Sequence, residues 1–421
     1  MSTPAGEKPT VLIIGPPWPQ SGTARLFENQ VEFYRSRGFA TIFVAVPIDC
    51  WYVESYKEWD SIRAGLAPVG ADWMLNAAVN YSRFLRSKYT VWAKHAFRPT
   101  ALDWIIMTGA SADLSADAER VIRNAPLKLI HVNHVFTLGF AKRILRTLIR
   151  NQRQISVVLE THDIQAQLLV DRGDLNPWTH RADALSRLVK AEDTNLRSLG
   201  VFLHCSIDDF EYFKSRMPKK THILALPTID ESFVKRVLAS PPSAMPIDLL
   251  FVGQSTEPNL LGIKWFFDEV WPLISDQGYQ ISIAGKIELM VREQLPAIHK
   301  KFCKYFLGHV PDLAGLYASA RCVFAPMMSG TGISIKTVEA LAVGKPFVGT
   351  SKAYRGMPMA RLSQFGLQAH DTPQSFARAI VEALAHESSA AVASRQAYEA
   401  LFSRKAAFAA RESAFRIATS A

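Results

Sequence analysis

Residues 329–347 read SGTGISIKTVEALAVGKPF, a glycine-rich loop that runs directly into a segment with a helical pattern. Gly330 and Gly332 flank Thr331, and the apolar residues that follow recur at the spacing of a helix packed on a sheet. A helix that begins just after such a loop points free backbone N–H groups at whatever lies before it, and phosphate is the usual ligand. The stretch therefore predicts either a phosphate-binding loop or a tight turn followed by a core helix.

Short apolar runs of strand length recur on both sides of this stretch and alternate with helical patterns. In the second half of the chain they are DLLFVG (248–253), QISIAG (280–285), CKYFL (303–307), CVFA (322–325) and PFVGT (346–350). In the first half they are TVLIIG (10–15), TIFVAVP (41–47), LKLIHV (127–132), ISVVLE (155–160) and VFLHCS (201–206). The alternation predicts an α/β protein built from two doubly wound, Rossmann-like domains, each with a parallel sheet covered on both faces.

The join between the two series is expected at residues 240–246, SPPSAMP, because three prolines cannot continue a helix or a central strand. The 421-residue length also favours two cores over one. We therefore predict a first domain over residues 1–240 and a second over 241–400. Residues 401–421 are expected to form a C-terminal helix that packs back on the first domain.

Composition narrows the class of protein further. The four cysteines are far apart and have no metal-ligand or paired spacing, which argues against a zinc site or a disulfide framework and favours a reducing cytoplasm. The N-terminal MSTPAGEKPT lacks the apolar core of a signal peptide, and no run approaches the roughly 20 apolar residues of a membrane span. If a membrane is involved, we expect the protein to lie on its surface.

The net charge of +10 is concentrated in one region. Residues 81–153 hold 13 Lys and Arg against 4 Asp and Glu, chiefly in the acid-free segments 81–99 and 140–154. The second segment has the pattern of an amphipathic basic helix, which is typical either of a surface helix with its apolar side in the core or of a helix facing a membrane. No nucleic-acid reading motif accompanies the charge, so nucleic acid is not expected as a partner.

Three segments in order, LLFVGQSTEPNLLGIKWFFDEVWPLI (249–274), FLGHVPDLAGLYASARCVFAP (306–326) and SGTGISIKTVEALAVGKPFVGTS (329–351), resemble the donor-domain motifs of family 4 glycosyltransferases with the GT-B fold. The first half is similar more loosely, through residues 15–30, 130–141 and 159–167. The resemblance implies two domains facing across a cleft and retaining transfer of a sugar from a nucleotide diphosphate sugar. It implies no required metal ion or other cofactor, and a glycan or lipid-linked acceptor held on the side of the first domain.

The donor must lose a nucleotide diphosphate, so its site needs groups that stabilise growing negative charge. The amides of the glycine loop and the cations of two lysines suit this need, and the resemblance places a ribose-binding glutamate one helical turn further on. The chain departs from the family at Thr331, where a first glutamate is common, and it lacks the arginine that often follows the first donor-domain strand. The expected donor-binding residues are Gln254, Lys264, His309, Val310, Gly330, Thr331, Gly332, Ile333 and Glu339, with Lys336 placed among the catalytic groups.

In the first domain, Gly22 and Thr23 belong to a small-residue turn suited to close approach of a sugar or diphosphate. The resemblance implies that His134 is the active-site histidine, with His162 as the alternative, and that Asp163 orients the acceptor. No pair of carboxylates in one motif offers a nucleophile and an acid, as a retaining hydrolase would need. For this fold the implied mechanism is front-face substitution, in which the leaving phosphate oxygen takes the acceptor proton.

The leading hypothesis is therefore a cytoplasmic glycosyltransferase of polysaccharide or glycolipid synthesis, peripheral at the inner face of the membrane. Aromatic residues alternate with Lys and Arg in residues 81–99, which suits an anionic membrane surface. A catalytically silent module that binds a nucleotide sugar or a partner is the main alternative, because of Thr331 and the missing arginine. A sugar-nucleotide epimerase of the same fold is disfavoured by the form of the GTGISIKTVEALA series.

Overall fold

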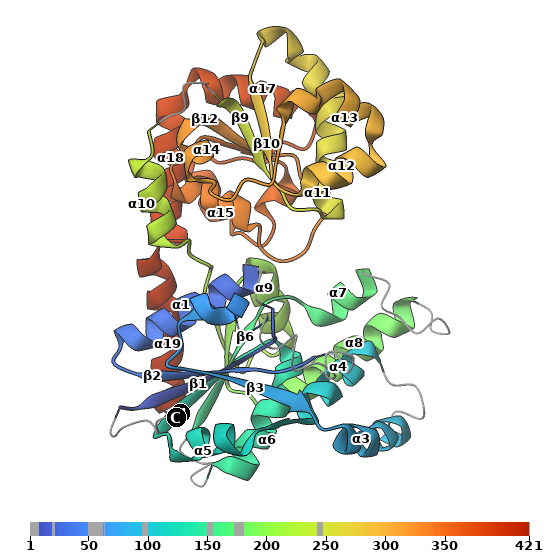
Figure 1. Cartoon of the computed structure of the whole chain (residues 1–421), viewed down its shortest axis with the longest axis vertical. Coiled ribbons are helices and arrows are strands. Elements are labelled where there is room, and N and C mark those ends of the chain that lie inside the picture. The colour runs from blue at the N-terminus through green and yellow to red at the C-terminus, as the bar shows by residue number, and fades with distance from the viewer. Residues whose placement is uncertain are drawn as a thin grey trace. The chain divides into compact units, whose positions relative to one another are not determined.

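The computed structural model describes residues 8–18, 22–48, 62, 64–94, 100–149, 155–171, 181–241 and 247–420. The chain divides into two compact units, the first formed by residues 1–225 with 408–421 and the second by residues 226–407 (Figure 1). The division lies ahead of the expected boundary at residue 240. Helix α10 (Glu231–Ala239) packs on α14 (Ala314–Ser319) of the second unit, with the Phe233 ring against Tyr317, so residues 226–240 belong there.

The first unit contains a sheet in the order β4-β3-β2-β1-β5-β6-β7-β8, parallel apart from the β3–β4 pair. Five expected strands are present in it, within two residues at each end. The sheet is parallel as expected except at its edge, where the short strand β4, which has only three residues and gave no apolar run, pairs antiparallel with β3. The strands are β1 (Thr10–Gly15), β2 (Ala40–Ala45), β3 (Trp73–Val79), β4 (Ala112–Leu114), β5 (Leu127–Asn133), β6 (Ser156–Thr161), β7 (Val201–His204) and β8 (Thr221–Leu224).

Side chains alternate between two hydrophobic clusters on the two faces of this sheet. Leu12 and Ile14 pack into one cluster with α4 (Ala101–Ala110), α5 (Ala116–Asn124), α6 (Leu138–Leu148) and α8 (Arg181–Leu196). Val11 and Ile13 pack into the other with α1 (Gly22–Ser36) and the end of α19 (Arg404–Ser420). The C-terminal residues 408–420 therefore cover one face of the first sheet, and both faces are buried, which is why its central strands read as unbroken apolar runs.

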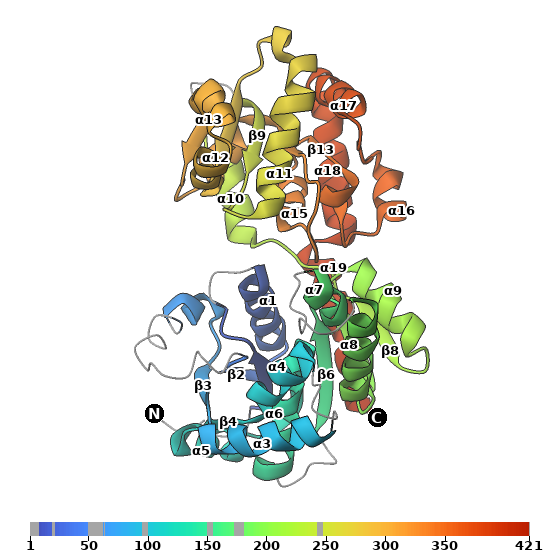
Figure 2. The ribbon, with the colours of Figure 1, turned by 90° about the vertical axis from the view of Figure 1, so that its right-hand side faces the viewer.

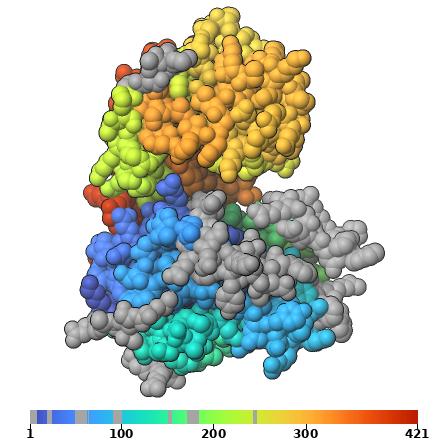
Figure 3. All heavy atoms as spheres, in the orientation of Figure 1, coloured from blue at the N-terminus to red at the C-terminus, as the bar shows by residue number. Residues whose placement is uncertain are grey.

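The basic segment 140–154 was expected to be either a surface helix with its apolar side in the core or a helix facing a membrane. Helix α6, which contains its residues 140–148, decides between the two. Phe140, Ile144 and Leu148 are buried in the core of the first unit, and Arg143 pairs with Asp113. The apolar side of α6 therefore faces the sheet and does not face a membrane. Helix α3 (Tyr81–Lys94) differs, because it rests on α4 at the rim of the first unit (Figures 2 and 3). The side chains of Tyr81 and Tyr89 on this helix are exposed.

The second unit contains a five-stranded parallel sheet in the order β11-β10-β9-β12-β13. Its strands are β9 (Ile247–Val252), β10 (Ile281–Ala284), β11 (Phe306–Gly308), β12 (Ala320–Ala325) and β13 (Phe347–Gly349). Its helices are α10, α11 (Glu257–Trp265), α12 (Ile287–Gln294), α13 (Pro296–Phe302), α14, α15 (Ile335–Ala342), α16 (Met359–Leu362), α17 (Pro373–Ala385) and α18 (Glu387–Leu401). The remaining described helices of the first unit are α7 (Gln165–Asp171) and α9 (Ile207–Arg216).

Candidate active site

The loops that follow β9, β10, β11 and β12 lie at one edge of the second sheet, since these parallel strands are neighbours. Gln254, the pair His309 and Val310, and the glycine loop 329–334 each follow one of these strands. The backbone is tight here: a Cβ on Gly285 would lie 2.1 Å from the carbonyl oxygen of Gly253, and Gly285 has a φ of +111°. This edge therefore brings the expected donor-binding loops together without bulky side chains at the closest approach.

The glycine loop reaches α15 through two residues in the left-handed region, Gly330 with φ of +126° and Gly332 with φ of +63°. Its backbone is held by Arg355, whose Nε donates to the carbonyl oxygen of Thr331 at 3.0 Å. A Cβ on Gly330 would lie only 3.0 Å from that same Nε. The loop thus enters α15 through backbone conformations that favour glycine, with Thr331 exposed and Ile333 half-buried.

Lys336, in the first turn of α15, connects two of these loops. Its ammonium group donates to Oδ1 of Asn259 at 2.6 Å and lies 4.4 Å from the ring centre of Phe251. Asn259 in turn donates to the carbonyl oxygen of Gln254 at 2.8 Å. Burial, assisted by the nearby charge of Arg355, lowers the pKa of Lys336 to about 7. A ligand with negative charge would favour its protonated form.

Glu339 is half-buried one turn further along α15, and its carboxylate accepts a hydrogen bond from the Tyr317 hydroxyl at 3.2 Å. Tyr317 is fully buried, and burial together with the charge of Glu339 raises its pKa well above the usual value. The hydroxyl is thus a donor that fixes one carboxylate oxygen.

The structure does not bring Lys264 to this edge. Lys264 lies in the last turn of α11, whereas the loop after β9 precedes the first turn of that helix. Its side chain is 52% exposed, and its ammonium group pairs with Asp268 at 2.5 Å. We therefore withdraw Lys264 from the site, because seven helical residues, 257–263, separate it from the loop it was expected to serve.

Sequence reasoning missed Arg355 and Asn259. Arg355 follows β13, the edge strand next to β12, so its place at the carboxyl edge was a usable signal. The part played by Asn259 gave no signal, because its contact with Lys336 joins residues 77 positions apart. Arg355 places a cation beside the glycine loop, near Lys336.

In the first unit, His134 and His162 follow the neighbouring strands β5 and β6. Their rings stack with centroids 4.1 Å apart, and Phe136 stacks on the other side of His134 at 4.6 Å. His134 has a φ of +66°, which no other described residue except glycine shows. Burial, with the nearby His162, lowers the pKa of His134 well below its usual value, so this ring is neutral near pH 7. A strained, buried histidine whose ring nitrogens have no hydrogen-bond partner among the described residues is a candidate for a functional role.

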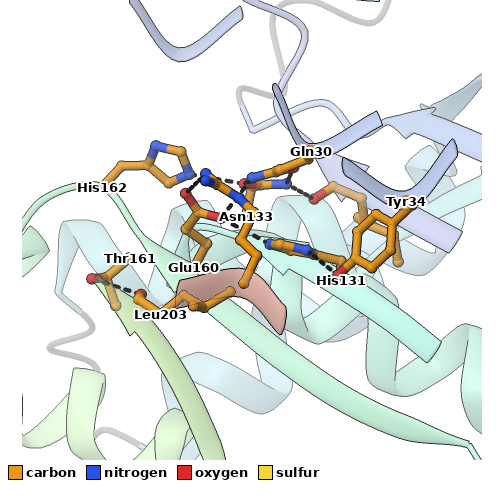
Figure 4. A network of polar contacts seen from close by, with 10 residues as sticks. Gln30, Tyr34, His131, Asn133, Glu160, Thr161, His162 and Leu203 are labelled. Carbon is orange, nitrogen blue, oxygen red and sulfur yellow. Dashed lines mark hydrogen bonds and ion pairs between the residues drawn. The ribbon is translucent and has the colours of Figure 1, made fainter. Parts of the chain in front are cut away.

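His162 belongs to a buried network of polar side chains (Figure 4). The carboxylate of Glu160 on β6 is at the centre of this network. Its Oε1 lies 3.0 Å from Nη2 of Arg411 on α19, and its Oε2 lies 3.1 Å from Nε2 of His131 on β5. Asp163 follows His162 and is half-buried at the same edge. Gly22 and Thr23 begin α1, but their side-chain surroundings and Ser21 lie outside the described residues.

Metal ligands do not gather at either edge: the described ranges contain no group of three His, Cys, Asp or Glu side chains that could hold a metal ion. Likewise, no helix in these ranges is long and apolar enough to cross a membrane.

Comparison with known proteins gives one family and many similar folds. Residues 246–386 match the family of glycosyl transferases group 1. The chain is similar in structure to sucrose-phosphate synthase from Thermosynechococcus elongatus, with a TM-score of 0.61, 13% identity, and coverage of 98% of this chain and 99% of that one. No curated protein sequence matches the chain.

Two further similar structures contain bound ligands. Anabaena Alr3699/HepE, in complex with UDP and glucose, has a TM-score of 0.57 and 12% identity, and the match covers 96% of this chain and 98% of that one. The pneumococcal O-GlcNAc transferase GtfA, in complex with UDP and GlcNAc, has a TM-score of 0.58 and 12% identity, with coverage of 98% and 99%. These likenesses confirm the expected two-sheet α/β fold.

Proposed function

We propose that this chain, whose residues 246–386 match the family of glycosyl transferases group 1, transfers a sugar, with retention of configuration, from a nucleotide diphosphate sugar to a glycan or lipid-linked acceptor. The observation that carries the proposal is the joined pair of loops in the second unit. Lys336, tied to the loop after β9 through Asn259, sits in the first turn of the helix that follows the glycine loop.

The leaving diphosphate gains negative charge as the glycosidic bond breaks, so groups that bind the departing oxygens lower the barrier. In the proposed arrangement the amides of residues 330–333 and the ammonium of Lys336 bind the diphosphate, and Glu339 accepts hydrogen bonds from the ribose hydroxyls. Arg355 holds the loop and adds positive charge beside it. These protein cations offset the charge of the leaving group, and we propose that no metal ion is required.

On the acceptor side, we propose that His134 forms part of the wall against which the transferred sugar lies and that Asp163 orients the acceptor hydroxyl. The neutral, stacked ring of His134 suits a contact with a sugar, because it presents an apolar edge and nitrogens that can bind a hydroxyl. The leaving phosphate oxygen takes the acceptor proton in this proposal, which leaves no nucleophilic carboxylate to be assigned.

A lipid-linked acceptor agrees with the exposed face of α3. Tyr81 is 66% exposed, Leu85 36% and Tyr89 68%, and these residues recur every four positions along one side of the helix. Arg86 and Lys88 lie on the same helix, which contains no acidic residue. Aromatic rings beside cations suit the headgroup region of an anionic membrane, and we propose a peripheral location at the cytoplasmic face.

The test is a panel of nucleotide sugars, each incubated with the protein and with candidate acceptors, with release of nucleotide diphosphate as the readout. We expect one donor class to be consumed, and in the presence of excess chelator the rate should not change. Binding of a nucleotide sugar without any release, with all donors and acceptors, would support the catalytically silent module instead. Loss of the rate on chelation would contradict metal independence alone.

A further inference from the structure

The buried network in the first unit fixes the position of one proton on His162. Arg411 is 1% exposed and donates from Nη2 to Oε1 of Glu160 at 3.0 Å, and Glu160 is fully buried. Burial alone would raise the pKa of Glu160, but the charge of Arg411 and a hydrogen bond from His131 lower it to about 2. Glu160 is therefore a carboxylate that only accepts hydrogen bonds.

This acceptor orients the side-chain amide of Gln30. The second carboxylate oxygen of Glu160 lies 2.9 Å from Nε2 of Gln30, so the NH2 group must face Glu160 (Figure 4). The same NH2 group donates to Oδ1 of Asn133 at 2.7 Å, and Oε1 of Gln30 accepts from Nδ2 of Asn133 at 3.0 Å. Gln30 thereby passes the orientation set by Glu160 on to Asn133.

A second contact, with the backbone carbonyl of Ile14, fixes the same orientation of the Asn133 amide. Its Nδ2 donates to the backbone carbonyl oxygen of Ile14 at 3.2 Å, and a carbonyl oxygen cannot donate. A flipped Asn133 would place its own oxygen against that carbonyl and against Oε1 of Gln30. Glu160 at one end of this chain of contacts and the Ile14 carbonyl at the other can only accept hydrogen bonds. The side-chain amides of Gln30 and Asn133 between them can therefore adopt only one orientation.

The consequence reaches His162. Oδ1 of Asn133 lies 2.9 Å from Nε2 of His162, so Nε2 must carry the proton. Burial lowers the pKa of His162 to about 4, opposed by Glu160, so the ring is neutral near pH 7. Its proton is then on Nε2, and Nδ1 keeps a lone pair. Nδ1 is buried and has no hydrogen-bond partner among the described residues, and it faces away from the network (Figure 4).

We infer that Nδ1 of His162 accepts a hydrogen bond from a hydroxyl of the sugar substrate, and that Glu160 and Arg411 are positioning residues that hold His162 in the required tautomer. The identity of the hydroxyl-bearing ligand rests on the proposed function, whereas the tautomer does not. A buried acceptor left without a donor destabilises the protein, and a hydroxyl bound at this nitrogen removes that cost. The C-terminal helix α19 thus contributes to the site through Arg411.

The tautomer is measured on the full chain labelled with ring-15N histidine, by long-range proton–nitrogen correlation, with His162 assigned from the signal lost in His162→Gln. We expect a protonated Nε2 and an unprotonated Nδ1 in the wild type, unchanged between about pH 6 and about pH 8. Glu160→Gln removes the acceptor-only group and should give a mixture of tautomers. Tyr34→Phe is the matched control, because Tyr34 contacts His131 in the same network but not Gln30 or Asn133, and it should leave His162 unchanged.

A protonated Nδ1 on His162 in the wild type would overturn the inference whatever the variants do. The substrate contact is tested by kinetics: His162→Ala should raise KM for the hydroxyl-bearing substrate about tenfold, the size of one unmade hydrogen bond. His162→Asn, whose Oδ1 can stand where Nδ1 stood, should recover most of that loss. Equal KM values for Ala, Asn and wild type would contradict the contact. If no sugar is transferred by any protein, the proposed function fails, while the tautomer measurement still decides the network.

Discussion

The ammonium group of Lys336 donates to Oδ1 of Asn259 at 2.6 Å and so ties the helix after the glycine loop to the loop after β9. Lys336 is partly buried and lies near the charge of Arg355, and these surroundings lower the pKa of its ammonium group to about 7. Its charge near neutral pH therefore depends on what else is bound, and an anionic donor substrate would draw a proton onto it.

Donor binding should consequently depend on pH. The protonated form of Lys336 binds the diphosphate, so affinity should be highest below about pH 7 and fall as pH rises through that value, with proton uptake on binding that rises toward one above it. Calorimetric titration with a nucleotide sugar in buffers of different ionisation enthalpy measures the uptake. Lys336→Met should bind weakly and without this pH dependence. Lys264→Met, which removes an exposed lysine paired with Asp268, is the control and should bind as the wild type does.

Glu339 should contribute through the ribose. Glu339→Gln is expected to weaken donor binding about tenfold, or about 1.4 kcal/mol, because a charged acceptor for the ribose hydroxyls is lost. A 2′,3′-dideoxy analogue of the donor should bind wild type and Glu339→Gln almost equally. Tyr317→Phe keeps the carboxylate but removes its buried donor, and a smaller loss is expected. A full tenfold penalty with the dideoxy analogue would refute a ribose contact.

His134 combines backbone strain with a proposed contact to the transferred sugar. His134→Ala and His134→Gly should both lower turnover far more than donor affinity. The two variants should differ in stability, because glycine adopts the φ of +66° without penalty, so His134→Gly is expected to be more stable than His134→Ala by about 1 kcal/mol. Chemical denaturation measures the difference. Equal stability would show that the strain is small, and unchanged turnover would transfer the role to His162.

Glu160 should make the first unit sensitive to acid. Its folded pKa of about 2 lies below the usual 4.5, so its stabilising contribution is complete above about pH 4.5 and is lost as pH falls toward 2. The free energy of unfolding, measured by denaturant titration across this range, should decline more steeply in the wild type than in Glu160→Gln. Identical pH profiles would mean that the Arg411–Glu160 pair does not lower this pKa.

The exposed face of α3 should bind anionic vesicles at low ionic strength. Changing Arg86 and Lys88 to Glu should weaken co-sedimentation, since each cation near such a surface contributes about 1 kcal/mol. Replacing Tyr81, Leu85 and Tyr89 by Ser should weaken it at high salt as well. Arg120 and Arg123 of α5, also exposed, serve as the matched control when changed to Glu. No vesicle binding by the wild type would defeat the membrane proposal and leave the transferase unaffected.

Periodicity alone identified most strands, because buried parallel strands are continuous apolar runs whatever lies beside them. It missed β3, β4 and β8, which lie toward the edges of the first sheet, where strands are short or half-exposed and the apolar signal fades. It located the glycine loop and the histidines after β5 and β6 because each follows directly from a strand end. Periodicity could not predict which side chains contact one another across the fold.

Only the tertiary structure decided which polar groups meet. Arg411 and Glu160 are 251 positions apart, and Lys336 and Asn259 are 77 apart, so no local pattern could pair them. The sequence offered Lys264 as a cation, whereas packing turned it toward Asp268 and placed Arg355 at the loop instead. Local sequence reports how each segment prefers to fold and which face it buries. Contacts between residues far apart in the sequence form only when the buried faces of the helices and strands pack together. The proposed binding groups of this protein depend on such contacts.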